Sequence, residues 1–285
     1  MTSHPAEIKD VLSFDIEDWF HIVEVQSLSD PNAWPNMESL VERYTEWIIE
    51  TVTDAGVTCT FFVLGWIAER YPHLVEMMTK HGHEVGTHSY WHRKVYELEP
   101  GTFMEDMQRS IDVIEAAGGQ KVLGFRAPSF SITPGTEWAF DVLHDLGIQY
   151  DASLFPTTRA HGGYPCPEGP HIFNDAPSGR PMPELPMSVM HIGPKRMAFS
   201  GGGYLRLLPL WAIRRGFEQA HRRGLPTVIY LHPRDFAPDC PRVPMPLHRR
   251  FKCYVNTAGT KNKLHALLQQ YQFTSCADLL GISRS

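Results

Sequence analysis

Short apolar runs rich in β-branched and aromatic residues alternate with longer stretches of helical periodicity along most of this chain, and that alternation limits the possible folds more than any other feature. Strands that are separated by helices pair in parallel, so the pattern predicts an α/β protein with a parallel sheet. We expect strands at 11–14, 58–64, 84–87, 122–126, 148–151 and 226–231, and helices at 37–54, 66–80, 101–117, 136–146, 208–223 and 261–270.

One segment departs from this rhythm. Residues 155–205 are rich in proline and glycine and hold few long apolar runs, which predicts loops and a small β-hairpin inserted into the domain. A C-terminal extension is expected at 240–285. Because α/β barrels of about 200–250 residues commonly form one unit, we expect the 285 residues to fold as a single domain.

Charge and cysteine content exclude several classes of protein. The formal net charge is −6 and no basic run is present, so we expect no nucleic-acid partner. No apolar run approaches the roughly 18 residues of a membrane span, and the polar residues 1–9 lack the core of a signal peptide. The five cysteines form no C-x-x-C pair, which predicts free thiols. We therefore expect a protein of the cytoplasm or of the inner membrane face; its oligomeric state stays open.

Two histidines are spaced as metal ligands. His88 and His92 follow an expected strand at positions i and i+4, which would place both imidazoles on one face of a helical turn. Neutral imidazole is a common ligand of zinc, cobalt and nickel. The spacing alone does not distinguish this pair from surface histidines in a chain that contains fifteen.

Charged residues at other strand ends favour the metal interpretation. Asp15, Glu17 and Asp18 follow the first strand, and carboxylates this close repel one another unless a cation compensates them. Arg126 and His232 each end a later strand, and the carboxyl ends of parallel strands meet at the edge where active sites form. A single metal-dependent hydrolase site accounts for all of these residues.

The same residues follow the order of motifs in a known family. The chain resembles the NodB-type polysaccharide deacetylases, carbohydrate esterase family 4, over about residues 10–235. The matching motifs are Asp15 in Ser-Phe-Asp-Ile-Glu-Asp, His88-Ser-x-x-His92 preceded by Glu84-Val-Gly86, Arg126-Ala-Pro128, Asp151, and Leu231-His232-Pro233. Segments 201–209, 230–238 and 251–256 also resemble a subgroup associated with exosortase and exopolysaccharide loci.

This resemblance implies a fold, an activity and a set of roles. The fold is an irregular (β/α) barrel of seven or eight strands, a distorted TIM-type barrel, and the activity is removal of N-acetyl groups from amino sugars in carbohydrates. The implied metal is zinc, with cobalt and nickel as alternatives. The implied roles are Asp15 as the base held by Arg126, His88 and His92 as metal ligands, His232 as the acid, and Asp151 bonded to the other nitrogen of His232.

The chain departs from the family in two motifs. Ile16 follows Asp15 where the family has a second aspartate, so the third metal ligand is Glu17 or Asp18. Strand alternation puts Glu17 on the face of Asp15, whereas a chain already turning out of the strand would present Asp18, and both stay open. Ser129 stands where the family often has tyrosine, and its backbone N–H is expected to contact the oxyanion. Candidates for stacking on the sugar are Trp19, Trp91, Phe130 and Tyr204.

Two other functions are compatible with the same sequence. Some relatives act on small non-sugar amides or imides, and a panel of N-acetylhexosamine oligomers against ureides and imides separates the two activities. An inactive carbohydrate-binding protein would usually have lost Asp15, a histidine or Arg126, and none is missing. The triple glycine at 201–203 lacks the setting of a phosphate loop and indicates permissive backbone near the site.

Overall fold

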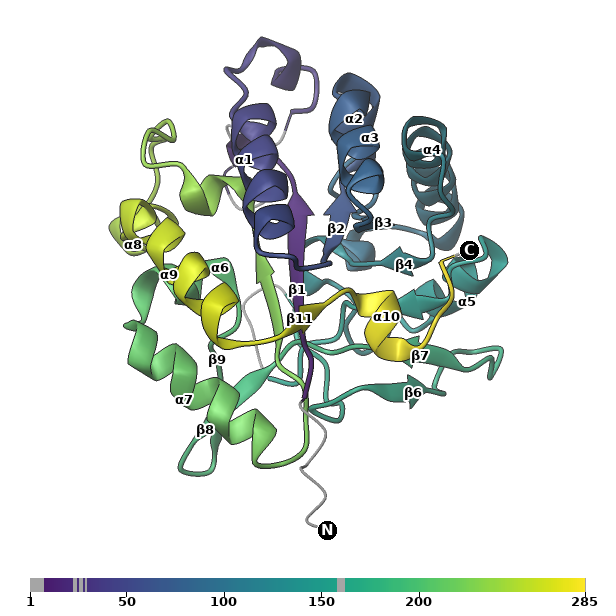
Figure 1. Ribbon diagram of the computed structural model, residues 1–285. Coiled ribbons are helices and arrows are strands. Elements are labelled where there is room, and N and C mark those ends of the chain that lie inside the picture. The colour runs from purple at the N-terminus through teal and green to yellow at the C-terminus, as the bar shows by residue number, and fades with distance from the viewer. Residues whose placement is uncertain (1–7, 23–24, 26–27, 29, 158–161, 285) are drawn as a thin grey trace.

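A computed structural model of the chain describes residues 8–22, 25, 28, 30–157 and 162–284 (Figure 1). Its strands are β1 (Asp10–Ile16), β2 (Thr60–Val63), β3 (Glu84–Thr87), β4 (Gly124–Phe125), β5 (Tyr150–Asp151), β6 (His171–Phe173), β7 (Met182–Glu184), β8 (Val189–Ile192), β9 (Lys195–Ala198), β10 (Val228–Leu231) and β11 (Phe273–Thr274). Within these residues nine strands form one curved sheet in the order β10-β1-β2-β3-β4-β5-β7-β6, with β11 beside β1. Every ladder in it is parallel except the one between β6 and β7. The predicted α/β fold with an irregular barrel is therefore confirmed.

Helices follow the strands and cover the sheet. They are α1 (Val41–Asp54), α2 (Gly65–Arg70), α3 (Pro72–Lys80), α4 (Pro100–Gly118), α5 (Trp138–Asp145), α6 (Gly202–Leu207), α7 (Leu210–His221), α8 (Leu247–Tyr254), α9 (Thr257–Gln270) and α10 (Cys276–Leu280). In Figure 1, α1 to α4 stand next to one another along one side of the sheet, and α7 lies beside the β8–β9 hairpin. The apolar faces of α1 to α5 and the buried strands form the main core. None of the helices in the described part of the chain combines the length and apolar character that a membrane crossing requires.

The expected helix at 66–80 is two helices in the structure. Pro72 begins α3, and the residue before a proline is excluded from helical backbone angles because its N–H and Cβ would meet the proline ring. Tyr71 accordingly has φ −129° and ψ 60°, which breaks the helix after Arg70. The helix expected at 37–54 begins later, at Val41, and α6, α8 and α10 were not predicted.

The loop-rich segment contributes more to the sheet than the sequence indicates. The predicted hairpin is present as β8–β9, but β6 and β7 extend the main sheet, with Glu184 of β7 beside Asp151 of β5. The C-terminal segment also joins the sheet, because β11 pairs with the beginning of β1 through Asp10 and Phe273. Figure 1 shows this segment in yellow, running from α9 across the base of β1 to α10.

Pairing of the first and last long strands prepares the site. β1 and β10 lie side by side with Phe14 opposite Leu231, and both strands are completely buried, as in a sheet covered on both faces. The residues that follow this register position are Asp15 on one strand and His232 on the other. Two residues that are more than two hundred positions apart thus leave the sheet at the same edge.

Candidate active site

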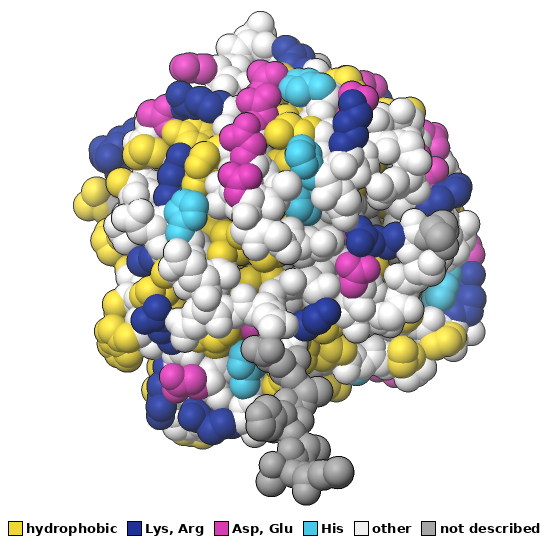
Figure 2. All heavy atoms as spheres, viewed as in Figure 1, with side chains coloured by type: hydrophobic (Ala, Val, Ile, Leu, Met, Phe, Trp, Pro, Cys, Tyr) yellow, Lys and Arg dark blue, Asp and Glu magenta, His cyan; other side chains and the backbone are white. Residues whose placement is uncertain are grey.

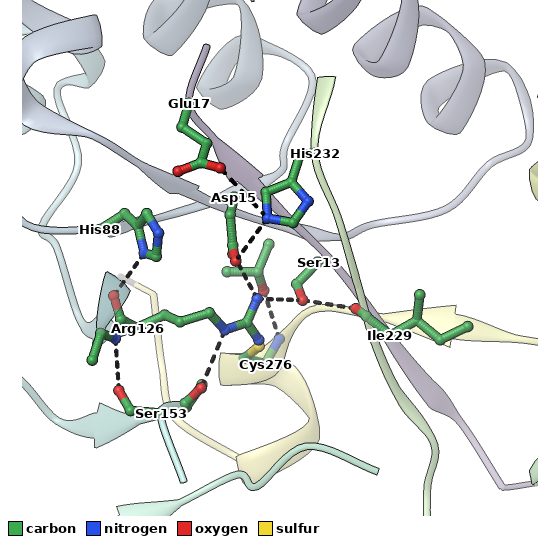
Figure 3. Close-up of polar contacts among 12 residues, drawn as sticks. Ser13, Asp15, Glu17, His88, Arg126, Ser153, Ile229, His232 and Cys276 are labelled. Atoms are coloured by element: carbon green, nitrogen blue, oxygen red, sulfur yellow. Dashed lines mark hydrogen bonds and ion pairs between the residues drawn. The ribbon is translucent and has the colours of Figure 1, made fainter. Parts of the chain in front are cut away.

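The polar residues expected at the strand ends do converge at this edge (Figure 3). Asp15 Oδ2 lies 3.9 Å from His232 Nε2, and His232 Nε2 lies 3.7 Å from Glu17 Oε1. Asp15 and Glu17 are each 2% exposed, so both carboxylates lie almost wholly out of water. Two carboxylates and an imidazole are therefore close enough to contact one small molecule at this edge.

Arg126 holds several parts of the site together. Its fully buried guanidinium donates through Nη1 to Asp15 Oδ1 and to Ser13 Oγ, both at 2.8 Å, and through Nε to the Ala152 carbonyl at 3.1 Å. Its own carbonyl oxygen accepts a hydrogen bond from His88 Nδ1 at 2.7 Å. The same residue therefore compensates the charge of Asp15 and orients the His88 ring (Figure 3).

Glu17, His88 and His92 form a group that fits a divalent metal. One ligand atom from each lies within 4.8 Å of the others, and Glu17 Oε2 is 2.5 Å from His92 Nε2. Burial lowers the pKa of His88 to about 4, which keeps the ring neutral, and its Nδ1–H bond to the Arg126 carbonyl leaves Nε2 for an ion. Apart from the His92 ring, Glu17 Oε2 has no hydrogen-bond partner among the described residues. Two imidazoles and one carboxylate are the ligand set of several catalytic zinc sites.

Asp18 is directed elsewhere. Its carboxylate accepts hydrogen bonds from Ser39 Oγ at 2.6 Å and from the backbone N–H groups of Trp19, Leu40 and Val41. These donors are unpaired N–H groups at the beginning of α1 and of the short 3-10 helix Trp19–His21, so Asp18 acts as a cap. Of the two carboxylates that the sequence leaves open, the structure brings Glu17 to the histidines.

His88 and His92 do not lie on the helical turn that their spacing predicts. Ser89 and His92 have φ values of 65° and 55°, the left-handed region that non-glycine residues seldom adopt. Asp106 holds this loop by accepting the N–H groups of Tyr90 at 2.7 Å and Trp91 at 3.2 Å. The i, i+4 spacing brings the rings together, at 5.0 Å between centroids, through a strained loop that α4 supports.

The partner of His232 differs from the one expected. His232 Nδ1 is 3.0 Å from Asp235 Oδ2, and Asp235 Oδ1 is 2.9 Å from Arg206 Nε. Burial alone would raise the pKa of Asp235, but the charges of Arg206 and His232 outweigh it and hold the pKa well below its ordinary value. A Cβ on Gly202 would lie 1.8 Å from Asp235 Oδ2, so the triple glycine permits close approach of α6 to this carboxylate.

Asp151 therefore does not contact His232 as predicted. Its carboxylate accepts hydrogen bonds from Ser153 N at 2.9 Å and Ser153 Oγ at 2.6 Å, and Glu184 lies beside it on β7. Asp151 lies on β5, which β1 to β4 separate from β10, the strand that His232 follows. Asp235, in contrast, lies in the 3-10 turn Pro233–Phe236 directly after His232. Ser153 in turn accepts the Ala127 N–H at 2.7 Å, which ties Asp151 to the backbone that carries Arg126.

The remaining predicted residues divide by exposure. Trp19 and Phe130 are 7% and 4% exposed and pack in the core, and Trp19 donates its indole N–H to the Glu38 carbonyl. A ring with so little free surface does not offer a face to a sugar, so that expectation is wrong for these two. Trp91 and Tyr204 are half-buried and keep such a surface. Ser129 and Phe130 have φ values of 57° and 56°, so the backbone is strained next to Arg126.

A second group with metal-like composition lies on the surface. Glu42, Glu46 and His73 bring ligand atoms within 4.8 Å of one another on α1 and α3, and Figure 2 shows acidic side chains in a stripe over α1. This group is mostly exposed and His73 already pairs with Glu42 at 2.9 Å. Exposed carboxylates in this arrangement are common without an ion, so this group offers an exposed comparison for the buried one.

Comparison with known proteins divides the chain in two. Residues 32–150 match the polysaccharide deacetylase family, and residues 152–281 match a domain of unknown function (DUF3473). A peptidoglycan-N-acetylglucosamine deacetylase of Bacillus cereus is 25% identical over 121 residues, which are 38% of this chain and 44% of that protein. The chain spans less than half the length of the curated relatives that it matches.

Solved structures share the fold over nearly the whole chain. A Mycobacterium smegmatis protein assigned as a polysaccharide deacetylase superposes with a TM-score of 0.61 at 15% identity, covering 99% of this chain and 97% of that one. A carbohydrate esterase family 4 pseudoenzyme from Bacillus anthracis gives a TM-score of 0.50 at 17% identity, covering 97% of this chain and 66% of that one. With the ordered motifs and the family match, residues 32–150 form a polysaccharide deacetylase (NodB-type, carbohydrate esterase family 4) domain, and nearly the whole chain shares the fold of these solved structures.

Proposed function

We propose that the protein is a metal-dependent N-deacetylase that hydrolyses the N-acetyl amide of an amino sugar in a polysaccharide or its oligosaccharide precursor. The observation that carries the proposal is the group Glu17, His88 and His92 beside Asp15 and His232. A divalent ion, zinc by its ligand set, would supply polarisation of the amide carbonyl and acidification of water. The Bacillus cereus relative, named for deacetylation of N-acetylglucosamine in peptidoglycan, supports the sugar substrate.

Asp15 is assigned as the general base. It is buried, it is paired with Arg126 through one oxygen at 2.8 Å, and its other oxygen faces the site toward His232. The ion pair fixes the direction of the carboxylate, so that Oδ2 can take a proton from the attacking water. Arg126 is a positioning residue in this scheme because its contacts are with Asp15, Ser13 and Ala152.

His232 is assigned as the general acid. The bond from Nδ1–H to Asp235 orients the ring, so that in its imidazolium form Nε2–H is directed at the site and can give its proton to the departing amine. An amine is a poor leaving group, so this proton is required for cleavage of the carbon–nitrogen bond. The Ser129 N–H is assigned to the developing oxyanion, a contribution of about 3–4 kcal/mol for a well-placed donor.

We also propose that the chain works as one catalytic domain. The first half supplies Asp15, Glu17 and both histidine ligands, whereas His232, Asp235 and Arg206 come from the second half. β10 of the second half pairs with β1 of the first, so neither half would complete the acid and base alone.

The test is acetate release by the purified protein from N-acetylglucosamine oligomers, measured as prepared, after chelation and after addition of zinc, cobalt or nickel. We expect activity to disappear with the metal and to return with it. Asp15→Asn should keep the metal and lose about 10³-fold in turnover, within the range for loss of a general base. His88→Ala should lose the metal itself.

A surface histidine provides the matched control. His73→Ala removes an imidazole from the exposed group Glu42, Glu46 and His73 and should leave metal content and acetate release unchanged. Turnover that survives complete chelation, or full activity in Asp15→Asn, would contradict the mechanism. A protein that binds metal but releases acetate only from ureides, imides or other non-sugar amides would contradict the substrate.

A further inference from the structure

Arg234 is a charged residue at the site for which the proposed chemistry has no use. It lies in the 3-10 turn after His232, and its Nη2 is 3.7 Å from Glu17 Oε1. That separation is too long for a hydrogen bond. Its Nε atom is buried without a hydrogen-bond partner, and the described residues supply no hydrogen-bond acceptor to the guanidinium. The side chain is 23% exposed, so part of it stays open to a ligand.

An arginine in this state is unusual on energetic grounds. Buried charges are normally paired and hydrogen-bonded, because removing them from water costs several kcal/mol otherwise. Arg126 and Arg206 also each have one buried nitrogen without a hydrogen-bond partner, but both have a carboxylate at 2.8–2.9 Å. Arg234 differs from them in having no carboxylate within hydrogen-bond distance. Glu17, at 3.7 Å, also faces His92 and His232, and Asp235, the other carboxylate that acts on Arg234, is paired with Arg206.

A count of the ionised groups shows what is missing. Asp15 cancels Arg126 and Asp235 cancels Arg206, which leaves Glu17 at −1 and Arg234 at +1. A divalent ion on Glu17, His88 and His92 would raise this sum from 0 to +2. Attack by water moves a proton to Asp15 as the oxyanion forms, so hydrolysis of a neutral amide leaves this excess positive charge in the site. Beside the ion, the guanidinium of Arg234 carries positive charge without a hydrogen-bond acceptor among the described residues.

We propose that Arg234 binds an oxyanion, a carboxylate or a phosphate, carried by the substrate beside its acetamido group. The planar fork of a guanidinium matches both groups through two parallel hydrogen bonds. The substrate class is then an N-acetylated amino sugar that is itself acidic, or that is joined to an acidic neighbour, instead of a neutral N-acetylglucosamine polymer. This inference rests on the proposed deacetylase function.

The experiment compares four matched sugars. They are the methyl glycoside of N-acetylglucosamine, its C6 carboxylate analogue, N-acetylglucosamine 6-phosphate and N-acetylglucosamine 1-phosphate. We expect wild-type kcat/KM to be on the order of ten- to a hundredfold higher for at least one acidic sugar than for the neutral one. The carboxylate and the two phosphates show which oxyanion, and which position on the ring, the site accepts.

Substitutions at Arg234 connect that preference to the residue. Arg234→Gln should reduce the ratio of acidic to neutral kcat/KM to near one, and Arg234→Lys should keep part of it, because an ammonium retains the charge but not the fork. Arg215→Gln is the matched control, since Arg215 is a 61% exposed arginine on α7, and it should leave both the ratio and the activity unchanged.

A binding measurement makes failure of this inference distinguishable from failure of the deacetylase proposal. Titration calorimetry with the same sugars on chelator-treated protein should show tighter binding of the acidic sugar by wild type than by Arg234→Gln. Arg234-dependent binding without turnover of any sugar would preserve the oxyanion site and reject the deacetylase. Turnover without a preference for acidic sugars would overturn the inference. An equal loss of turnover on all sugars in Arg234→Gln would overturn it too, and so would the absence of both binding and turnover.

Discussion

Glu84 and Glu17 are glutamates of one sheet, each 2% exposed, but they lie at opposite ends of the strands and differ in every contact. Glu84 begins β3 and accepts three hydrogen bonds, from Thr60 Oγ1 at 2.6 Å, Tyr150 Oη at 2.7 Å and Ala277 N at 3.0 Å. Glu17 follows β1, and apart from the His92 ring its Oε2 has no hydrogen-bond donor among the described residues. One carboxylate is saturated by the fold, and the other is left with capacity for a ligand.

The pKa values of Glu84 and Glu17 are shifted in opposite directions. Burial raises the pKa of Glu84, and its neutral neighbours only partly offset this. Burial acts on Glu17 as well, but the charges of His92 and then Arg234 outweigh it and hold the pKa well below its ordinary value. Groups at the amino ends of barrel strands typically serve stability, and those at the carboxyl ends serve function. The hydrogen bonds to the two carboxylates agree with this division, because Glu84 at the amino end is fully bonded and Glu17 at the carboxyl end is not.

Glu17→Ala is expected to have the largest effect. Removal of one of three ligands from the metal group should abolish stoichiometric metal binding and lower acetate release by at least about 10³-fold, since the metal and its water are both lost. Metal content after dialysis and acetate release with excess zinc measure this. A variant that keeps one metal ion per chain would break the comparison, because Glu17 would then be as structural as Glu84.

Glu84→Ala is the matched substitution, with the opposite expectation. It leaves Thr60, Tyr150 and the Ala277 N–H without their acceptor in the interior, so we expect a loss of about 3 kcal/mol in the free energy of unfolding. Metal content and kcat/KM per folded molecule should stay within about threefold of wild type. Urea denaturation and acetate release measure the two quantities.

If Glu84→Ala does not fold, Glu84→Gln keeps the shape and loses part of the hydrogen bonding, and it should be less stable than wild type but equally active. A loss of metal from a folded Glu84 variant would contradict the division of roles between the two ends of the sheet.

Much of the site followed from the sequence because strand ends can be located from periodicity. Asp15, Arg126 and His232 each come directly after, or at the end of, an apolar run, and parallel pairing brings such ends together. The choice between Glu17 and Asp18 could not follow from periodicity. It depends on hydrogen bonds from Ser39 to Val41 at the start of α1, more than twenty residues away.

Other site residues were missed although local signals exist. Asp235 lies three positions after His232 across a proline, the spacing of a side chain that caps a short turn, and this signal favours it over the distant Asp151. Asp106 lies among the buried residues of α4, where a carboxylate needs donors that only the folded loop at Tyr90 and Trp91 provides. Arg234 has no such signal, because what distinguishes it is a missing partner.

The smallest expected effect concerns a third buried carboxylate, Glu184, which extends the comparison to a pair. Burial, and then the adjacent charge of Asp151, raise the pKa of Glu184 well above its ordinary value of 4.5. Above pH 4.5 the folded protein therefore keeps a proton that the unfolded chain releases. The stabilisation from this group is fully present below pH 4.5 and is lost as the pH rises through the folded pKa.

Glu184→Gln removes that titration. As the pH rises from 5 to 6, the unfolding free energy of the wild type should fall by on the order of 1 kcal/mol relative to the variant. The upper limit for one proton is about 1.4 kcal/mol per pH unit. Urea unfolding across this range measures the difference, with Glu97→Gln as an exposed control that should run parallel to wild type. A difference that stays constant or changes in the opposite direction would mean that Glu184 is ionised in the folded protein and resembles Glu17 more than Glu84.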